Sequence, residues 1–207
     1  MYICLNLPPP SNSLIDQVRQ YATSVQFDSD GKRWLEEFHN GAITAALHTQ
    51  GGNINDNINR QMIQEFQKFF PKHQFTSTVG VFKNESSGPA CLPPHIDRGR
   101  SLAINYFVDL GGEQVQTIFY SVTAPVHPDK SINVRLNETG AVLDKVIFKP
   151  GWHAFRTDHC HCVENIETTR IYIAIKILNS NHNIDNNYSF DNFLNDYPEL
   201  IFSQIQD

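Results

Sequence analysis

Cysteine is scarce in this sequence, which has four such residues in 207, namely Cys4, Cys91, Cys160 and Cys162. The chain starts MYICLNLPPP, without the basic segment and the longer apolar stretch of a secretory signal peptide. Domains that depend on disulfide bonds are normally secreted, and cytosolic thiols are kept reduced. We therefore expect four reduced thiols in a cytoplasmic protein.

Positive charge and long apolar runs are also lacking. The 16 Lys and Arg residues are outnumbered by 22 Asp and Glu, which gives a formal net charge of −6, and no basic run stands out. Non-specific nucleic-acid binding needs clustered Lys and Arg to neutralise phosphates, so the composition argues against it, while a substrate held by a local patch stays open. No stretch approaches the ~18 apolar residues of a membrane span, so we expect no membrane segment.

The first third of the chain predicts one short strand and two helices. MYICLNL has strand character and ends at three prolines. Ser11 or Ser13 can cap a helix that runs to about residue 25, and a second amphipathic pattern runs from residue 53 to 70. Between them, the small apolar residues of GAITAALHTQ fit a strand or a helix. The apolar positions of the two helices are Leu14, Ile15, Val18 and Tyr21, then Ile58, Met62, Ile63, Phe66 and Phe70.

After Pro71 the pattern changes to short strands rich in Val, Ile, Thr, Phe and Tyr, separated by Gly, Pro and Asn turn signals. Seven segments qualify: 75–82, 101–110, 115–122, 141–148, 153–157, 161–166 and 170–178. Strands at this spacing predict a mainly β sandwich or jelly roll. We expect one domain over residues 1–207. Its parts are an N-terminal strand with supporting helices (1–72), a β core (73–180) and a weakly helical tail (181–207).

The segment RIYIAIKIL (170–178) alternates strictly, so Ile171, Ile173, Ile175 and Ile177 lie on one face. A face made only of isoleucine needs a covering layer, and the two N-terminal helices can supply one. The opposite face then points into the β core and begins with Arg170. A buried arginine is costly unless an anion pairs with it. The strand is compatible with a bound anion, and equally with an arginine that reaches solvent at the strand end.

The stretch LPPHID places His95 and Asp97 two residues apart, on one face if the backbone is extended, as the preceding prolines favour. An imidazole and a carboxylate on one face are two ligands of a metal site. About one such pair is expected by chance among 9 histidines and 22 acidic residues. A second pair, His127 and Asp129, is interpreted as a surface turn. A third ligand is therefore needed to support a site.

GWHAFRTDHCHCVENIETTR supplies three candidates for this third ligand. His153 is interpreted as a strand residue at the mouth of the barrel. His159 shares a strand face with His161, but His161 lies in the apolar register and is preferred. Arg170 follows nine residues later, about the length of a hairpin. This spacing places the starts of the two strands at opposite ends or in nearby layers of one site.

Cys160 and Cys162 alternate with these histidines, so they point to the opposite face of an extended segment. We interpret both as buried, inert thiols. A structural zinc site built from the run Asp-His-Cys-His-Cys is the alternative, and it requires a loop in place of a strand.

The order His95-x-Asp97, His161, Arg170 resembles the HxD…H…R pattern of iron(II)- and 2-oxoglutarate-dependent oxygenases. The resemblance covers about residues 75–178, including PPHID, LGGEQVQTIFY and the closing segment from KPGWHAF to RIYIAI. It is closest to the prolyl-hydroxylase-like and aspartyl/asparaginyl-hydroxylase-like branches. It implies a double-stranded β-helix, a jelly roll of cupin type, with helices packed on one sheet.

The resemblance also implies the roles of the site residues. His95, Asp97 and His161 would hold Fe(II) as a facial triad. Arg170 would bind the 5-carboxylate of the cosubstrate 2-oxoglutarate, with Asn105 as a further contact. Dioxygen would then hydroxylate an unactivated C–H bond of a peptide side chain or small molecule, with release of succinate and CO2.

The chain departs from the family at one position, because many members have Arg-x-Ser where it has Arg170-Ile171-Tyr172. A tyrosine reaches differently from the serine that adds a second bond to the 5-carboxylate. Arg98 and Arg100 are either solvated charges or entrance residues that meet an acidic substrate.

Three other functions explain parts of the sequence. A cupin-type metalloenzyme that does not use 2-oxoglutarate shares the barrel, but usually presents His-x-His where this chain has His-x-Asp. A catalytically silent β-barrel that binds a partner is less favoured, because all three predicted ligands and the arginine are present. A lectin-like sandwich accounts for the strands and leaves the triad to coincidence.

Overall fold

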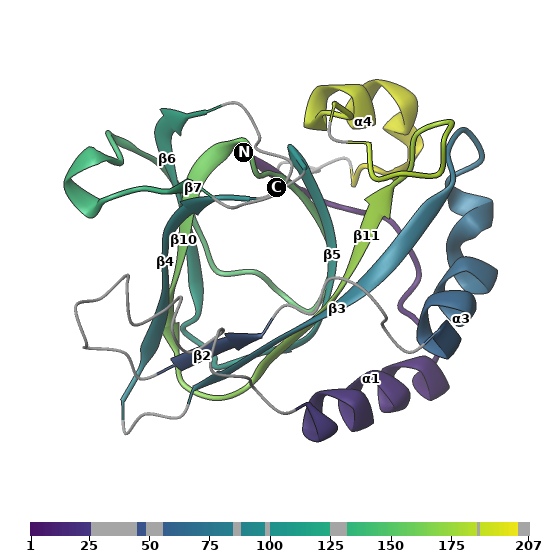
Figure 1. The fold of residues 1–207 in the computed structure, drawn as a ribbon, viewed down its shortest axis with the longest axis horizontal. Coiled ribbons are helices and arrows are strands. Elements are labelled where there is room, and N and C mark those ends of the chain that lie inside the picture. Colours follow the sequence, from purple (N-terminus) through teal and green to yellow (C-terminus); the bar gives the residue numbers. More distant parts are fainter. Residues whose placement is uncertain are drawn as a thin grey trace.

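The computed structural model describes residues 1–25, 45–48, 56–84, 88–97, 100–124, 132–185 and 187–202. The predicted mainly β class is confirmed, because the chain folds into two antiparallel sheets with few helices (Figure 1). The sheets face each other as in a jelly roll, and the space between them forms the interior of the barrel.

The larger sheet has the strand order β1-β9-β5-β11-β3-β2. In that order the strands are β1 (Tyr2–Cys4), β9 (Gly151–Arg156), β5 (Leu102–Leu110), β11 (Arg170–Ile177), β3 (Phe75–Asn84) and β2 (Ala45–His48). The smaller sheet has the order β7-β4-β10-β6-β8. Its strands are β7 (Ile132–Asn133), β4 (Ala90–Ile96), β10 (His159–Ile166), β6 (Gln116–Thr123) and β8 (Val142–Val146).

The helices are α1 (Asn12–Ser24), α3 (Asp56–Phe66) with the 3-10 turn η1 (Gln67–Phe69), and α4 (Phe190–Asp196) with η3 (Pro198–Leu200). A further 3-10 turn, η2 (Leu136–Glu138), precedes β8. Ser11 is the N-cap of α1, since its hydroxyl accepts a hydrogen bond from the amide of Leu14 at 3.3 Å. None of the helices in the described ranges is both long and apolar enough to cross a membrane.

The isoleucine face of β11 is covered by α1 and α3, as its alternation predicts. Figure 1 shows both helices on the outer side of the larger sheet, away from β4 and β10. One buried cluster joins the helices to the strands; it includes Leu14, Val18, Ile58, Met62, Phe66, Phe70, Val79, Ile104, Trp152, Ile171, Ile173, Ile175 and Ile177. The helix layer leaves the other face of the sheet, with Arg170 and Tyr172, directed into the barrel.

The seven predicted β segments all form strands, and GAITAALHTQ contains a further one, β2. Two strands of the core lie outside the predicted segments: the short β7, and β4, which carries His95. Strand β4 contains Pro93 and Pro94, which lack an amide donor and normally mark a loop. In the structure β4 tolerates them near the edge of the smaller sheet, where the Pro94 carbonyl accepts from the amide of Val134 at 3.0 Å.

The hairpin expected between His161 and Arg170 is wrong. Strand β10 pairs with β4 and β6, whereas β11 pairs with β3 and β5 in the other sheet. The chain between them therefore crosses from one sheet to the other. The spacing allowed the two strand starts to lie at opposite ends or in nearby layers of one site. The structure places them in the two facing sheets, which are nearby layers. The predicted tail helix is α4, and an antiparallel bridge joins Leu5 to Ile201 next to it.

Candidate metal centre

His95 and His161 lie directly opposite each other on the adjacent strands β4 and β10. Their ring centroids are 4.4 Å apart and each residue is only 5% exposed. The antiparallel register thus delivers two imidazoles to one point inside the barrel. Residues Phe119 and Phe155 pack against the ring of His161 with centroids 6.0 and 6.2 Å away, which makes an apolar wall behind it.

Asp97 follows β4 and completes the group. Its amide donates to the carbonyl of Thr157 at 3.2 Å, which fixes the backbone as the strand ends. Its Oδ1 lies 3.4 Å from Nε2 of His95 and 3.9 Å from Nε2 of His161. Within the described part of the chain, these three residues are the one group of three potential ligands whose donor atoms all lie within 4.8 Å of one another.

The two imidazoles are oriented by their own backbone. Nδ1 of His95 lies 2.7 Å from the carbonyl oxygen of Pro93, and Nδ1 of His161 lies 3.0 Å from that of His159. A carbonyl can only accept, so each Nδ1 carries the hydrogen and each Nε2 turns toward Asp97. Such second contacts are how proteins hold histidine ligands in the correct tautomer and orientation for a metal.

The electrostatics favour an ionised Asp97 and a neutral His161. Burial raises the pKa of Asp97, but Arg100 and the two imidazoles outweigh it and hold the pKa well below its usual range. Burial, reinforced by His95 and opposed by Asp97, lowers the pKa of His161 to about 4. A carboxylate with neutral imidazole nitrogens is the donor set of non-haem iron sites and also suits other divalent cations.

Arg100 is not the solvated charge that the sequence left open as one alternative. Its Nε donates to Oδ2 of Asp97 at 2.9 Å, and its Nη2 lies 2.8 Å from the same oxygen. Residues Arg98, His127 and Asp129 lie outside the described residues. The three-residue spacing of Asp97 and Arg100 is the one feature of the sequence that could have predicted this ion pair.

Arg170 lies at the start of β11 and is 6% exposed. Its Nη1 donates to the carbonyl of Leu110 at 3.4 Å, and its guanidinium lies 4.6 Å from the ring centroid of Phe107. Within the described ranges no carboxylate forms an ion pair with it. Burial lowers the pKa of Arg170 to about 10, so it remains a cation at neutral pH. A buried cation without an anion indicates a binding site for one.

Asn105 faces the same interior from β5, between its register partners His153 and Ala174. It is 4% exposed, and its Oδ1 has no hydrogen-bond partner among the described residues. An orphaned buried amide is expensive, and rotation of the carboxamide can present either a donor or an acceptor to a ligand. Together, Arg170 and Asn105 fit an acidic cosubstrate.

His153 and His159, the other two candidates for the third ligand, are not part of the group. His153 is a strand residue, as expected, but is buried, with Nδ1 3.6 Å from Sγ of Cys4 and Nε2 2.8 Å from the carbonyl of Lys149. The Nδ1 of His159 lies 3.3 Å from the carbonyl of Tyr120.

The zinc alternative is wrong, because the run that holds its ligands is the strand β10 and not a loop. Cys160 and Cys162 are free thiols in a buried cluster with Ile96 and Ile118. Burial raises the pKa of Cys160 to about 12 and that of Cys162 to about 11, which keeps both protonated.

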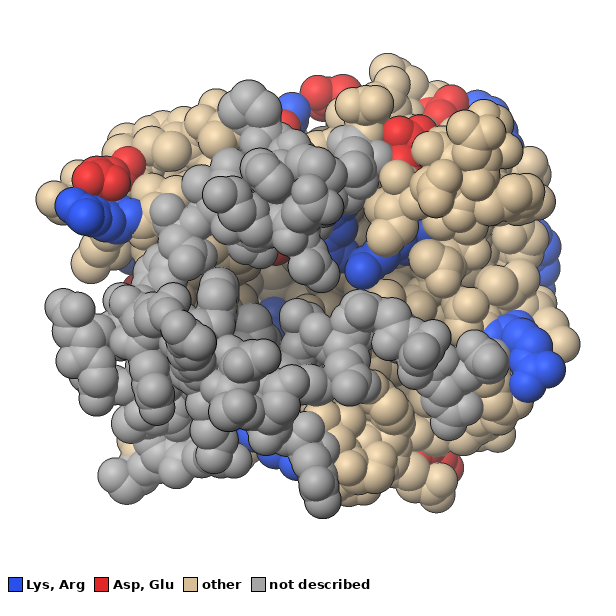
Figure 2. Space-filling model, in the orientation of Figure 1, with Lys and Arg blue, Asp and Glu red and all other residues tan. Residues whose placement is uncertain are grey.

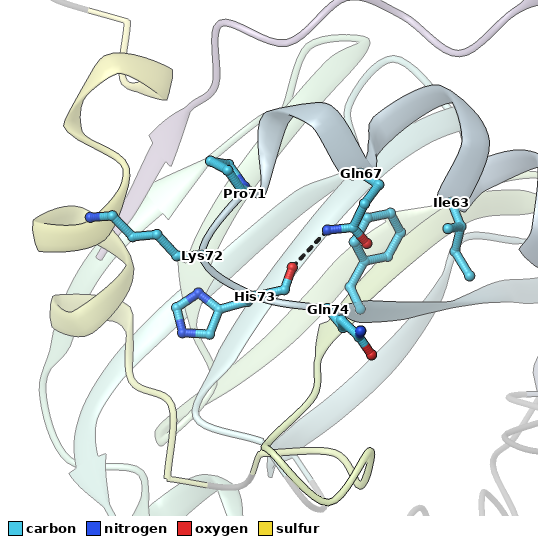
Figure 3. A pocket seen from close by; sticks show the side chains of 7 residues that line it. Ile63, Gln67, Pro71, Lys72, His73 and Gln74 are labelled. Atoms are coloured by element: carbon cyan, nitrogen blue, oxygen red, sulfur yellow. Dashed lines mark hydrogen bonds between the residues drawn. The ribbon is translucent and has the colours of Figure 1, made fainter.

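A separate groove of about 570 Å³ lies at the surface between α3 and β3 (Figure 3). Two of its polar side chains are paired with the protein. Gln67 donates to the carbonyls of Phe70 and His73, and Nδ1 of His73 lies 2.8 Å from the hydroxyl of Tyr197. Gln67 and His73 are thus engaged within the protein, in contrast to the unpaired groups around Arg170.

No protein-family model matches the chain, and no curated protein matches it in sequence. Among solved structures, the epimerase SnoN in complex with Fe3+, alpha ketoglutarate and nogalamycin RO has a TM-score of 0.50 and 11% identity. That alignment covers 84% of this chain and 77% of SnoN. It supports the double-stranded β-helix fold at the level of architecture.

Two further structures are more distant. A Pseudomonas putida prolyl-4-hydroxylase has a TM-score of 0.39 and 14% identity, over 86% of this chain and 90% of that one. The hydroquinone 1,2-dioxygenase PnpCD, with Cd2+ and 4-hydroxybenzonitrile, has a TM-score of 0.35 and 14% identity over 50% of this chain. The chain spans only 59% of the length of that dioxygenase chain.

Proposed function

We propose that the protein is an iron(II)- and 2-oxoglutarate-dependent dioxygenase that hydroxylates a C–H bond. The observation that carries the proposal is the convergence of the Nε2 atoms of His95 and His161 on Oδ1 of Asp97 inside the barrel. Two imidazoles and one carboxylate on one side of a metal leave positions free for a cosubstrate and dioxygen. The fold neighbour SnoN was solved with iron and alpha ketoglutarate, which agrees with this choice.

The residues of the chain prepare the site for these groups. When bound, iron(II) supplies the dioxygen activation that couples oxidative decarboxylation of 2-oxoglutarate to oxidation of the substrate. Arg170 neutralises the distal carboxylate of the cosubstrate with a planar, bidentate donor, and Asn105 offers a further polar contact. The apolar packing of Phe119 and Phe155 around His161 keeps water away from that ligand.

An anaerobic titration with iron(II) and then 2-oxoglutarate, followed by visible absorption, tests the proposal. We expect a weak charge-transfer band that appears only when both are present. His161→Ala should abolish iron binding, and Arg170→Gln should retain iron but weaken 2-oxoglutarate binding by about a hundredfold, since a buried charge-assisted pair is lost. His159→Ala is the matched control, because it removes the rival imidazole and keeps the carbonyl that orients His161.

The same titration separates the alternatives. Iron binding without any band on addition of 2-oxoglutarate would favour a cupin-type metalloenzyme that does not use this cosubstrate. No iron binding at all would leave a β-barrel binding protein. Loss of iron binding in His159→Ala, with retention in His161→Ala, would reverse the choice of the third ligand.

A further inference from the structure

Arg100 retains one unused donor beside the metal centre. Two of its nitrogens contact Asp97, whereas Nη1 is buried and has no partner among the described residues. Its backbone is anchored to the barrel, since the hydroxyl of Thr157 donates to the carbonyl of Arg100 at 2.9 Å. The side chain is 16% exposed, so little water is available to satisfy Nη1. A buried guanidinium N–H without a partner indicates an absent acceptor.

Tyr172 provides a second unused polar group on the interior face of β11. Its register partner on β3 is Gly80, and a Cβ at position 80 would lie 2.1 Å from Cζ and 2.5 Å from the hydroxyl oxygen of Tyr172. The tip of the ring therefore lies over Gly80, where only glycine leaves room. Within the described residues its hydroxyl makes no hydrogen bond, so it is free to bind a ligand.

Tyr172 and Arg170 both approach Phe107 of β5, but the tip of Tyr172 also extends over β3. Strand β11 lies between β5 and β3. Arg170 extends over Phe107 of β5, whereas the tip of the Tyr172 ring reaches Gly80 of β3. Burial raises the pKa of Tyr172, with Arg100 and Arg170 opposing and Asp97 adding to the effect, so the hydroxyl stays protonated within electrostatic range of the Asp97–Arg100 pair.

The charged groups of the described interior would carry a net positive charge even with a metal and a dicarboxylate bound. Arg100 and Arg170 are cationic, and Asp97 is anionic. A divalent metal adds two positive charges and a dicarboxylate such as 2-oxoglutarate removes two, which leaves one positive charge uncompensated. Unpaired buried charge is unfavourable, so an anionic substrate is favoured over a neutral one. Figure 2 shows Lys and Arg side chains near the middle of this face.

We propose that Nη1 of Arg100 and the hydroxyl of Tyr172 bind a carboxylate of the substrate, in a subsite beside the metal centre and separate from the Arg170 pocket. The proposal rests on the proposed function and deepens it by naming the substrate class, which is a carboxylic acid. The carboxylate belongs to a free acid or to an acidic side chain of a peptide. Tyr172 is thereby a specificity residue, and Gly80 sets its position.

Calorimetric titration of the anaerobic protein loaded with iron(II) and 2-oxoglutarate tests the subsite without turnover. The probes are two matched pairs, butanoate against butanamide, and capped Gly-Asp-Gly against capped Gly-Asn-Gly. We expect the acid of at least one pair to bind about tenfold more tightly than its amide, as for a charge-assisted hydrogen bond. The pair that shows the preference identifies the free acid or the peptide as the source.

Tyr172→Phe removes one oxygen and leaves the metal ligands in place. We expect it to weaken the preferred acid about five- to tenfold, with unchanged binding of its amide and of 2-oxoglutarate. Tyr106→Phe is the matched control, because this tyrosine packs against Trp152 in the helix-covered cluster on the other face of the sheet.

Three results would overturn the subsite. One is equal binding of acid and amide, or no binding of either acid at about 10 mM. Another is a Tyr172→Phe variant that weakens 2-oxoglutarate itself, which would assign Tyr172 to the cosubstrate pocket. The third is the absence of 2-oxoglutarate binding in the wild type, which would remove the proposed function as well. The first two leave that function intact, so the failures are distinguishable.

Discussion

Arg100 and Asp97 form an ion pair in which a single carboxylate oxygen takes both contacts. Nε and Nη2 of Arg100 lie 2.9 and 2.8 Å from Oδ2, while Oδ1 lies 3.4 Å from Nε2 of His95. The pair therefore reserves one oxygen of Asp97 for a metal ion. It also keeps Asp97 ionised in a site that burial would otherwise neutralise.

Arg100→Gln should lower the affinity for iron(II) about tenfold or more, because outer contacts of this kind typically contribute 10- to 100-fold to metal binding. Competition with a chelator under anaerobic conditions measures the change. Arg135→Gln is the control, since the side chain of Arg135 is 83% exposed. Equal affinity in the Arg100 and Arg135 variants would mean that Arg100 does not support Asp97.

Gly80→Ala should destabilise the protein by about 1–3 kcal/mol, as overpacking of a filled interior does. The reason is the 2.1 Å approach that the new Cβ would make to Cζ of Tyr172. Urea unfolding measures the free energy of unfolding. In a Tyr172→Ala background the same substitution should cost much less, with a coupling of about 1 kcal/mol or more between the two sites. An equal cost in both backgrounds would show that Tyr172 is not the obstacle.

The metal-free protein should lose stability as the pH falls from about 6.5 to about 4. The pKa of His161 is lowered from 6.5 to about 4, mainly by burial, so the unfolded chain takes up this proton first. The contribution of neutral His161 to the free energy of unfolding is fully present above pH 6.5. It is lost as the pH falls to about 4, by at most about 1.4 kcal/mol per pH unit. The lowered pKa of Asp97 acts in the same direction, but only below its ordinary value of 3.8.

Urea unfolding at several pH values, for the wild type and His161→Gln, isolates the effect of His161. The pKa of His153 is also lowered, chiefly by burial, so the wild type alone does not separate the two residues. The variant should show a flatter dependence of stability on pH between 6.5 and 4. An identical slope in both proteins would contradict the prediction.

Much of the fold could be predicted because its signals are local. Ser11 caps α1, the helices begin and end near the expected residues, and the isoleucines of β11 occupy the helix-covered face. The order of His95, Asp97 and His161 likewise named the group that the structure brings together. Spacing along one segment carries the information for α1 and β11, whereas the group of three was named through its resemblance to a known oxygenase pattern.

The rest depends on contacts between distant segments, which a single sequence does not contain. The prolines of β4 are acceptable only because of where that strand lies in the sheet. The pairing of Gly80 with Tyr172 needs the register of β3 against β11. The separation of β10 from β11 into two sheets is a property of the whole barrel. The spacing between His161 and Arg170 does not reveal it, and by itself predicts a hairpin.

Ile173 offers a direct test of the helix-covered face. It is fully buried in the cluster formed by α1, α3 and the larger sheet. Ile173→Val removes one methylene group and should cost about 1 kcal/mol of stability through lost burial and a small cavity. Ile184→Val makes the same change at a residue that is 39% exposed, and its cost should be smaller. Urea unfolding of both variants gives the comparison, and equal costs would contradict the assignment of the isoleucine face to the core.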